Sequence, residues 1–235
     1  MRDDDIDDML NRAADHAPEL DPALLDRITR SIGPTTPPVR PLPPWWAIAA
    51  GLSAVCVAVA VAGALLLGPH GIEKMQAWQV ALIFPALAFL IWLGAVRTVG
   101  EMIPGSRRRF AAWVFPVAAS IVLIAIFAIL FQDYRTERFV SQGLVCLRAG
   151  MLQAIPAALA GWFLLRRGFA VNAVAAGIAL GALAGLAGVS MLELHCVNFE
   201  APHVMVWHTA VVPLSGAAGA LLFWARRRFR RLASS

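Results

Sequence analysis

The chain has 235 residues, of which 59% are hydrophobic and only 15% are charged, and its formal net charge is +5. With a mean hydropathy of +0.68, it carries more apolar surface than one soluble core of this length can bury, which excludes a soluble globular domain. The long apolar runs lack the strict alternation of membrane-spanning strands. We therefore expect an all-α integral membrane protein.

Residues 1–33 differ from the rest of the chain because they are rich in acidic residues, and they predict two short amphipathic helices separated near Pro18. The second helix is expected to begin with Asp21 as its N-cap and Pro22 as its first helical residue. Gly33 is expected to end it. Residues 1–33 are therefore predicted to be a helical segment distinct from the membrane domain.

The apolar faces of these two helices have no core of their own to pack on. Residues 1–44 hold nine acidic residues and five arginines, which disfavours binding to an anionic lipid surface and favours a protein partner with a basic groove. The predicted partner-binding residues are Ile6, Leu10, Leu24, Leu25, Ile28 and Ile32.

Residues 34–44 hold six prolines in eleven positions. They cannot continue a helix and are expected to form a semi-rigid linker. Trp45 and Trp46 then mark the membrane interface, where indole rings concentrate. The predicted organisation is a cytoplasmic helical segment at 1–33, the linker at 34–44, a membrane domain at 45–225 and a basic tail at 226–235.

Six apolar runs approach the length of about 20 residues that a helix needs to cross a bilayer. They are residues 45–67, 77–96, 110–131, 146–165, 171–192 and 202–224. Of the 20 lysines and arginines, 16 fall on one side of a six-span arrangement, and positively charged loops are retained in the cytoplasm. We therefore expect a multi-pass protein in the lipid bilayer of the bacterial inner (plasma) membrane, with both termini cytoplasmic.

The connection between the last two runs faces outward in this topology and contains His195, Cys196, His203 and His208. Cys146, at the start of the fourth run, is expected at the same face. Imidazole and thiolate groups bind soft or borderline metal ions such as Cu, Zn and Cd, and two thiols in an oxidising compartment can form a disulfide. No standard zinc-ligand spacing is present, so metal ligation, disulfide formation and ordinary solvated side chains all remain open.

Three further features concern structure. Arg148 carries a charge within an outer helical turn, and Glu193 is its expected ion-pair partner in support of the site. Cys56, in the middle of the first run, fits a small buried apolar residue. Small residues recur at every fourth position in the fifth run, which allows the last three helices to approach closely. The glycines concerned are Gly161, Gly177, Gly181, Gly185, Gly188, Gly216 and Gly219.

The strings CLRAGML and LLRRG, the glycine-rich fifth run, and then LHC, APH and WH resemble the six-span bacterial membrane anti-sigma factors of the NrsF type, also described as the DUF1109 domain. The resemblance covers about residues 38–224, including the string PVRPLPP that precedes the first run. It implies a cytoplasmic N-terminal segment that sequesters an extracytoplasmic-function sigma factor. It also implies release when metal or oxidative stress alters two outer cysteines, which correspond to Cys146 and Cys196. The N-terminal segment departs from the family pattern in being longer and more acidic.

We therefore predict a membrane anti-sigma factor and not an enzyme. A membrane thiol oxidoreductase would need a CxxC pair or a quinone site, and a transporter would need ionisable residues near the middle of its helices. Neither pattern is evident. The alternative is a membrane metal-binding or thiol-redox protein, either a transporter or an oxidoreductase, without a sigma partner. Any metal ion is expected as a signal, no direct binding to nucleic acid is expected, and homodimer formation is left open.

Overall fold

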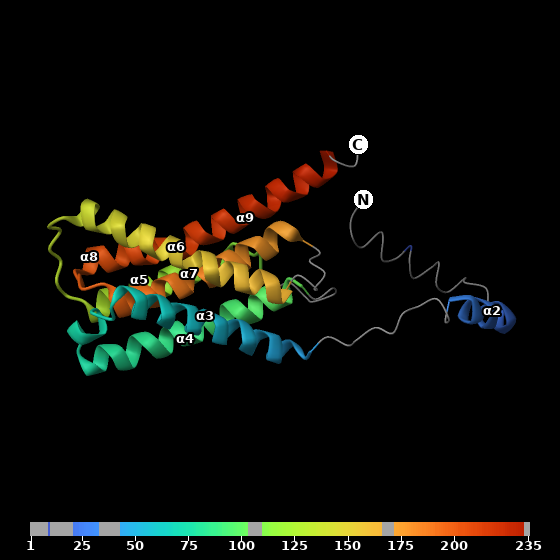
Figure 1. Ribbon diagram of the computed structural model, residues 1–235, viewed down its shortest axis with the longest axis horizontal. Coiled ribbons are helices and arrows are strands. Elements are labelled where there is room, and N and C mark those ends of the chain that lie inside the picture. The colour runs from blue at the N-terminus through green and yellow to red at the C-terminus, as the bar shows by residue number, and fades with distance from the viewer. Residues whose placement is uncertain (1–8, 10–20, 33–42, 103–109, 166–171, 233–235) are drawn as a thin grey trace. The chain divides into compact units, whose positions relative to one another are not determined.

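The computed structural model describes residue 9 and residues 21–32, 43–102, 110–165 and 172–232 (Figure 1). The chain divides into two units between Leu42 and Pro43. All of the regular secondary structure within the described residues is helical, which confirms the predicted all-α class.

In the N-terminal unit, helix α2 (Pro22–Ile32) has the start that the sequence predicts. The side chain of Asp21 accepts a hydrogen bond from the backbone N–H of Ala23 at 2.9 Å, which caps the helix. Leu24 and Leu25 are exposed, so this part of the predicted apolar stripe is uncovered. Ile6, Leu10 and the side chains of Ile28 and Ile32 lie outside the described residues.

The second unit is a helical bundle. Its elements are α3 (Trp45–Leu67), η2 (Ile72–Lys74, a short 3₁₀-helix), α4 (Ala77–Gly100), α5 (Val114–Leu130), α6 (Phe139–Leu165), α7 (Ala173–His195), α8 (Ala201–His203), η3 (Val204–His208, a π-helix) and α9 (Thr209–Leu232). Five segments are long and apolar enough to cross a membrane, which indicates a membrane protein. They are α3, α4, α6, α7 and the continuous segment from α8 into α9.

The third predicted span is shorter than expected. Helix α5 begins at Val114 and has 17 residues, because the chain forms a turn in which the backbone N–H of Val114 bonds to the carbonyl of Ala111. At 1.5 Å per residue, 17 residues extend about 26 Å, slightly less than a bilayer core of about 30 Å. The described helices therefore comprise five long candidate spans and one short apolar helix.

Other helix boundaries also differ from the predicted ones. Helix α6 begins at Phe139, so Cys146 lies two turns inside this helix and does not open it. Helix α7 continues to His195, and α9 continues through Leu232 into the predicted basic tail. Polar residues such as Ser141 and Gln142 are compatible with a helix end that extends beyond the apolar run, and hydropathy alone does not detect such extensions.

The bundle has two ends with different contents (Figure 1). The connections α3–α4, α5–α6 and α7–α8 gather at one end, whereas α3 begins and α4 finishes at the opposite end. We call the first of these the loop end. It holds Cys146 and the connection that follows α7.

Helix α7 is the centre of the bundle. Every residue from 179 to 193 is buried, and the helix contacts α3, α4, α6 and α9. This burial depends on small residues: a Cβ on Gly177 would lie 2.5 Å from the carbonyl oxygen of Gly219, and one on Gly185 would lie 2.9 Å from that of Val211. These backbone contacts between α7 and α9 confirm the predicted close packing of glycine-lined helices.

Replacing Gly181 by Ala is expected to destabilise the bundle, because the added methyl group would overlap the carbonyl oxygen of Ser215 on α9. Overpacking of this kind costs about 1–3 kcal/mol. Gly51 on α3 provides the matched control, since a methyl group added there would meet no atom within 4 Å. Thermal unfolding in detergent micelles should show a lower midpoint for Gly181→Ala and an unchanged or slightly higher one for Gly51→Ala. Equal midpoints would contradict the packing described above.

Candidate functional site

Four potential ligand side chains meet at the loop end. Cys146 comes from α6, Cys196 follows the last residue of α7, His203 ends α8, and His208 ends η3. Their ligand atoms all lie within 4.8 Å of one another. Cys146 is partly exposed and the other three residues are buried. We call these four residues the Cys–His cluster.

The two sulfurs of the cluster are 3.5 Å apart, although their residues are 50 positions apart in the chain. Cys196 Sγ also lies 3.7 Å from His203 Nε2. The expectation that topology brings Cys146 and Cys196 to the same end of the bundle is therefore met. Thiols at this separation can bind the same metal ion or form a disulfide with one another.

The π-helix η3 brings the two histidines together. In an α-helix, residues five apart point about 140° away from each other. In η3 the backbone N–H of Thr209 bonds to the carbonyl of Val204, five residues earlier, and this wider turn changes the alignment. The rings of His203 and His208 lie 5.2 Å apart between centroids and nearly perpendicular, at 77°. Such π-helical turns occur frequently at functional sites.

Glu193 supports the cluster, but its partner is not the predicted one. Its Oε1 lies 2.6 Å from Nδ1 of His208, and both side chains are fully buried. Arg148 is exposed on α6, and, two residues after Cys146, it points about 200° around the helix from that cysteine. The predicted Arg148–Glu193 pair is therefore wrong, and Glu193 orients His208.

Three polar atoms of the cluster and of the adjacent Glu193 have no hydrogen-bond partner among the described residues. They are Nε2 of His208, Nδ1 of His203 and Oε2 of Glu193, and all three are buried. A buried polar atom that makes no hydrogen bond costs about 1–3 kcal/mol. Nε2 of His208, together with Nε2 of His203 at 3.7 Å from Cys196 Sγ, places imidazole nitrogen near two sulfurs, a donor set that suits a metal ion.

His195 lies apart from the Cys–His cluster. Its Nδ1 is 2.8 Å from the backbone oxygen of Gly68, and its ring centroid is 6.4 Å from that of His70. Both of these histidines line a cleft of ≈ 480 Å³ that reaches Cys146 and Cys196. His70, which was not singled out in the sequence, thus belongs to the approach to the cluster together with His195.

Neighbouring connections hold the segment that carries Cys196 and His203. The amide of Asn198 donates to Gln142 Oε1 at 2.7 Å, and the backbone N–H of Ala201 donates to the carbonyl of Asp133 at 2.7 Å. The rings of Phe131 and Phe199 stack with centroids 5.0 Å apart. The connection after α7 is therefore fixed by contacts to α6 and to the α5–α6 connection.

The hydrogen bond with Cys146 and burial together raise the pKa of the Cys196 thiol above its ordinary value, while the hydrogen bond from His203 acts in the opposite direction. The third cysteine, Cys56, is buried in α3 with its sulfur 4.0 Å from the carbonyl oxygen of Leu183. It lies outside the Cys–His cluster.

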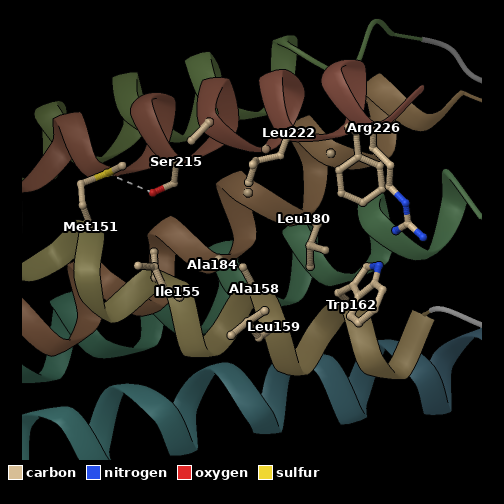
Figure 2. A pocket seen from close by; sticks show the side chains of 16 residues that line it. Met151, Ile155, Ala158, Leu159, Trp162, Leu180, Ala184, Ser215, Leu222 and Arg226 are labelled. Carbon is tan, nitrogen blue, oxygen red and sulfur yellow. Dashed lines mark hydrogen bonds between the residues drawn. The ribbon is translucent and has the colours of Figure 1, made fainter. Parts of the chain in front are cut away.

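An apolar groove of ≈ 470 Å³ runs between α6, α7 and α9 (Figure 2). At one end Ser215 donates to the sulfur of Met151 at 3.3 Å, and at the other the guanidinium of Arg226 lies 5.8 Å from the ring centre of Trp162. Met151 is five residues beyond Cys146 on α6, so the groove begins near the cluster. It separates parts of α6 from the tightly packed α7 and α9.

Comparison with known proteins identifies the family. A family model described as NrsF, negative regulator of sigma F, matches residues 34–230. The chain belongs to the NrsF family. NrsF is a family of regulators and not of enzymes, and its name implies that a sigma factor is the partner. The match includes the whole Cys–His cluster and leaves out residues 1–33. No curated protein and no solved structure matches the chain.

Proposed function

We propose that this protein is an anti-sigma factor of the bacterial inner membrane that holds an extracytoplasmic-function sigma factor through its N-terminal unit. Both termini lie in the cytoplasm, and the loop end of the bundle faces outward. A soft metal ion or an oxidant that acts on Cys146 and Cys196 changes the bundle and releases the sigma factor. The released sigma factor then binds core RNA polymerase.

The observation that carries the sensing part of this proposal is the 3.5 Å distance between the two sulfurs at the loop end. They belong to different helices, so any ligand that binds both of them constrains α6 relative to α7. A signal that must cross about 30 Å of bilayer needs a bundle with two packings that the ligand distinguishes. The apolar groove beside α6 supplies space for such a displacement (Figure 2).

The N-terminal unit supplies the features expected of the sigma-binding part. Leu24 and Leu25 are exposed on α2, and an exposed apolar stripe on a short helix is typical of a helix that docks into a groove of another protein. The nine acidic residues of positions 1–44 complement a basic surface. Residues 34–44, rich in proline, provide the spacer between this segment and the membrane.

Co-purification tests the proposal directly. The full-length chain is co-expressed, in turn, with each extracytoplasmic-function sigma factor of its source bacterium and is extracted in mild detergent. One sigma factor should co-purify with the full-length chain and be lost when residues 1–33 are deleted, because the proposed contact residues lie there. The bundle retained in the deletion variant serves as its own control for membrane insertion. A sigma factor that stays bound after the deletion would refute the assignment of the binding segment.

A further inference from the structure

We infer that Cys146, Cys196, His203 and His208 are the four ligands of a single divalent cation of the Zn²⁺ and Cd²⁺ class, and that Glu193 is the positioning residue for His208. This inference deepens the proposed function, on which it rests for its regulatory meaning, and it selects metal ligation over disulfide formation as the sensing chemistry. It also assigns the histidines to the site.

The spacing of the donor atoms fits four-coordinate binding. Zinc binds thiolate sulfur at about 2.3 Å and imidazole nitrogen at about 2.0–2.1 Å, so tetrahedral geometry requires about 3.8 Å between two sulfurs and about 3.6 Å between sulfur and nitrogen. The structure has 3.5 Å between Cys146 and Cys196 and 3.7 Å between Cys196 Sγ and His203 Nε2. The remaining pairs of ligand atoms lie within 4.8 Å. The ion would thus be bound after small displacements of the side chains.

Glu193 determines which nitrogen of His208 is available. An ionised carboxylate only accepts hydrogen bonds, so its 2.6 Å contact places the imidazole proton on Nδ1 and leaves the lone pair on Nε2. Nε2 of His208 is buried and has no hydrogen-bond partner among the described residues. A carboxylate that orients a metal-binding histidine through its other nitrogen is a recurrent feature of zinc sites. Glu193 is therefore placed to act on the ion through His208.

The cluster also has a route for the ion. The cleft of ≈ 480 Å³ is lined by Cys146, Cys196 and His203, and its other walls include His70, His195 and exposed residues of α6. His208 is fully buried and does not line the cleft. An ion that enters through the cleft meets the partly exposed Cys146 before it reaches His208.

The test uses the full-length protein in detergent micelles, reduced and free of metal. Titration with Co²⁺, followed by displacement with Zn²⁺ or Cd²⁺, should show one ion per chain, with the visible absorption of tetrahedral Co²⁺ and a sulfur-to-metal charge-transfer band. X-ray absorption on the Zn²⁺-loaded wild-type protein should show two sulfur and two nitrogen ligands, and this measurement needs no variant. Absence of binding, or ligation by the two sulfurs without nitrogen, would overturn the inference.

Single substitutions test the role of each residue in metal binding. His203→Ala and His208→Ala should each lower the affinity for Co²⁺ and alter its absorption spectrum. Cys56→Ser should change neither, because Cys56 lies in α3, outside both the cluster and the cleft. Glu193→Gln should lower the affinity about 10–100-fold with an unchanged ligand spectrum and an unchanged melting point of the metal-free protein. Unaltered affinity in Glu193→Gln, or a drop that follows the metal-free melting point, would overturn its role as a positioning residue.

The outcomes separate this inference from the proposed function. If the protein binds the ion as described and the ion does not release the sigma factor, the site stands and the sensing part of the proposed function fails. If an oxidant releases the sigma factor and no ion binds, the metal site fails and the proposed function stands.

Discussion

Serine at Cys146 or at Cys196 is expected to abolish the response of sigma-dependent transcription to metal and oxidant. Each substitution removes one sulfur from the pair that lies 3.5 Å apart, and a hydroxyl group is a poor ligand for soft metals and forms no disulfide. Loss of a residue that only orients a ligand already lowers metal affinity about 10–100-fold, so loss of the ligand itself should have at least this effect. A reporter gene controlled by the sigma factor provides the measurement.

The chain contains a matched control for these two variants. Cys56→Ser makes the same chemical change at a buried cysteine of α3 that lies outside the Cys–His cluster. It should retain the full response, as long as comparable amounts of protein reach the membrane. If Cys56→Ser and the two cluster variants behave alike, the response does not start at the sulfurs of Cys146 and Cys196. Both cluster variants should still co-purify with the sigma factor, because they leave the N-terminal unit unchanged.

Replacing Leu25 by Asp is expected to release the sigma factor without any signal. Leu25 is 46% exposed on α2, so the substitution leaves the unbound helix intact and places a charge where the proposed interface is apolar. Truncation of a central apolar contact costs about 2 kcal/mol or more, which is roughly a thirtyfold loss of affinity. The measurements are the affinity of the full-length protein for the sigma factor and the reporter level without inducer, which should rise.

Ala23→Asp controls for the added charge. Two residues away from Leu25, position 23 points about 160° away around α2 and therefore faces away from the stripe. Ala23 is also exposed, so the same acidic side chain should be tolerated there with little change in affinity. If both substitutions weaken binding equally, the effect is electrostatic, and the apolar stripe is not the contact surface.

The sequence predicted the class of fold and most of its helices because apolar runs of membrane length have few alternative structures. It also predicted that Cys146 and Cys196 share one end of the bundle, since this follows from the number of helices between them. The glycine spacing of α7 predicted its contact with α9, because only small side chains permit backbones to approach so closely. These three predictions rest on the length of the apolar runs, the number of helices between two residues, and side-chain volume. All three can be read directly from a sequence.

Other features depend on contacts that no local pattern reveals. The π-helical turn that aligns His203 with His208 has no sequence signature, and a spacing of five residues in an α-helix separates the two side chains. The partner of Glu193 was mistaken because charge alone favoured Arg148, whereas the path of η3 buries His208 against this carboxylate. The helix boundaries were displaced because polar residues extend α6 and α9 beyond their apolar runs.

Two hydrogen bonds join the α3–α4 connection to the end of α7. The backbone N–H of Gly71 donates to the carbonyl of Leu194 at 2.9 Å, and His195 Nδ1 meets the carbonyl of Gly68. Helix α3 begins at Trp45, directly after the proline-rich residues, and ends at Leu67, directly before Gly68. The helix that follows the proline-rich residues is thus hydrogen-bonded, just beyond its C-terminal end, to the residues directly before Cys196. A displacement of Cys196 would therefore act on the C-terminal end of α3 through these two hydrogen bonds.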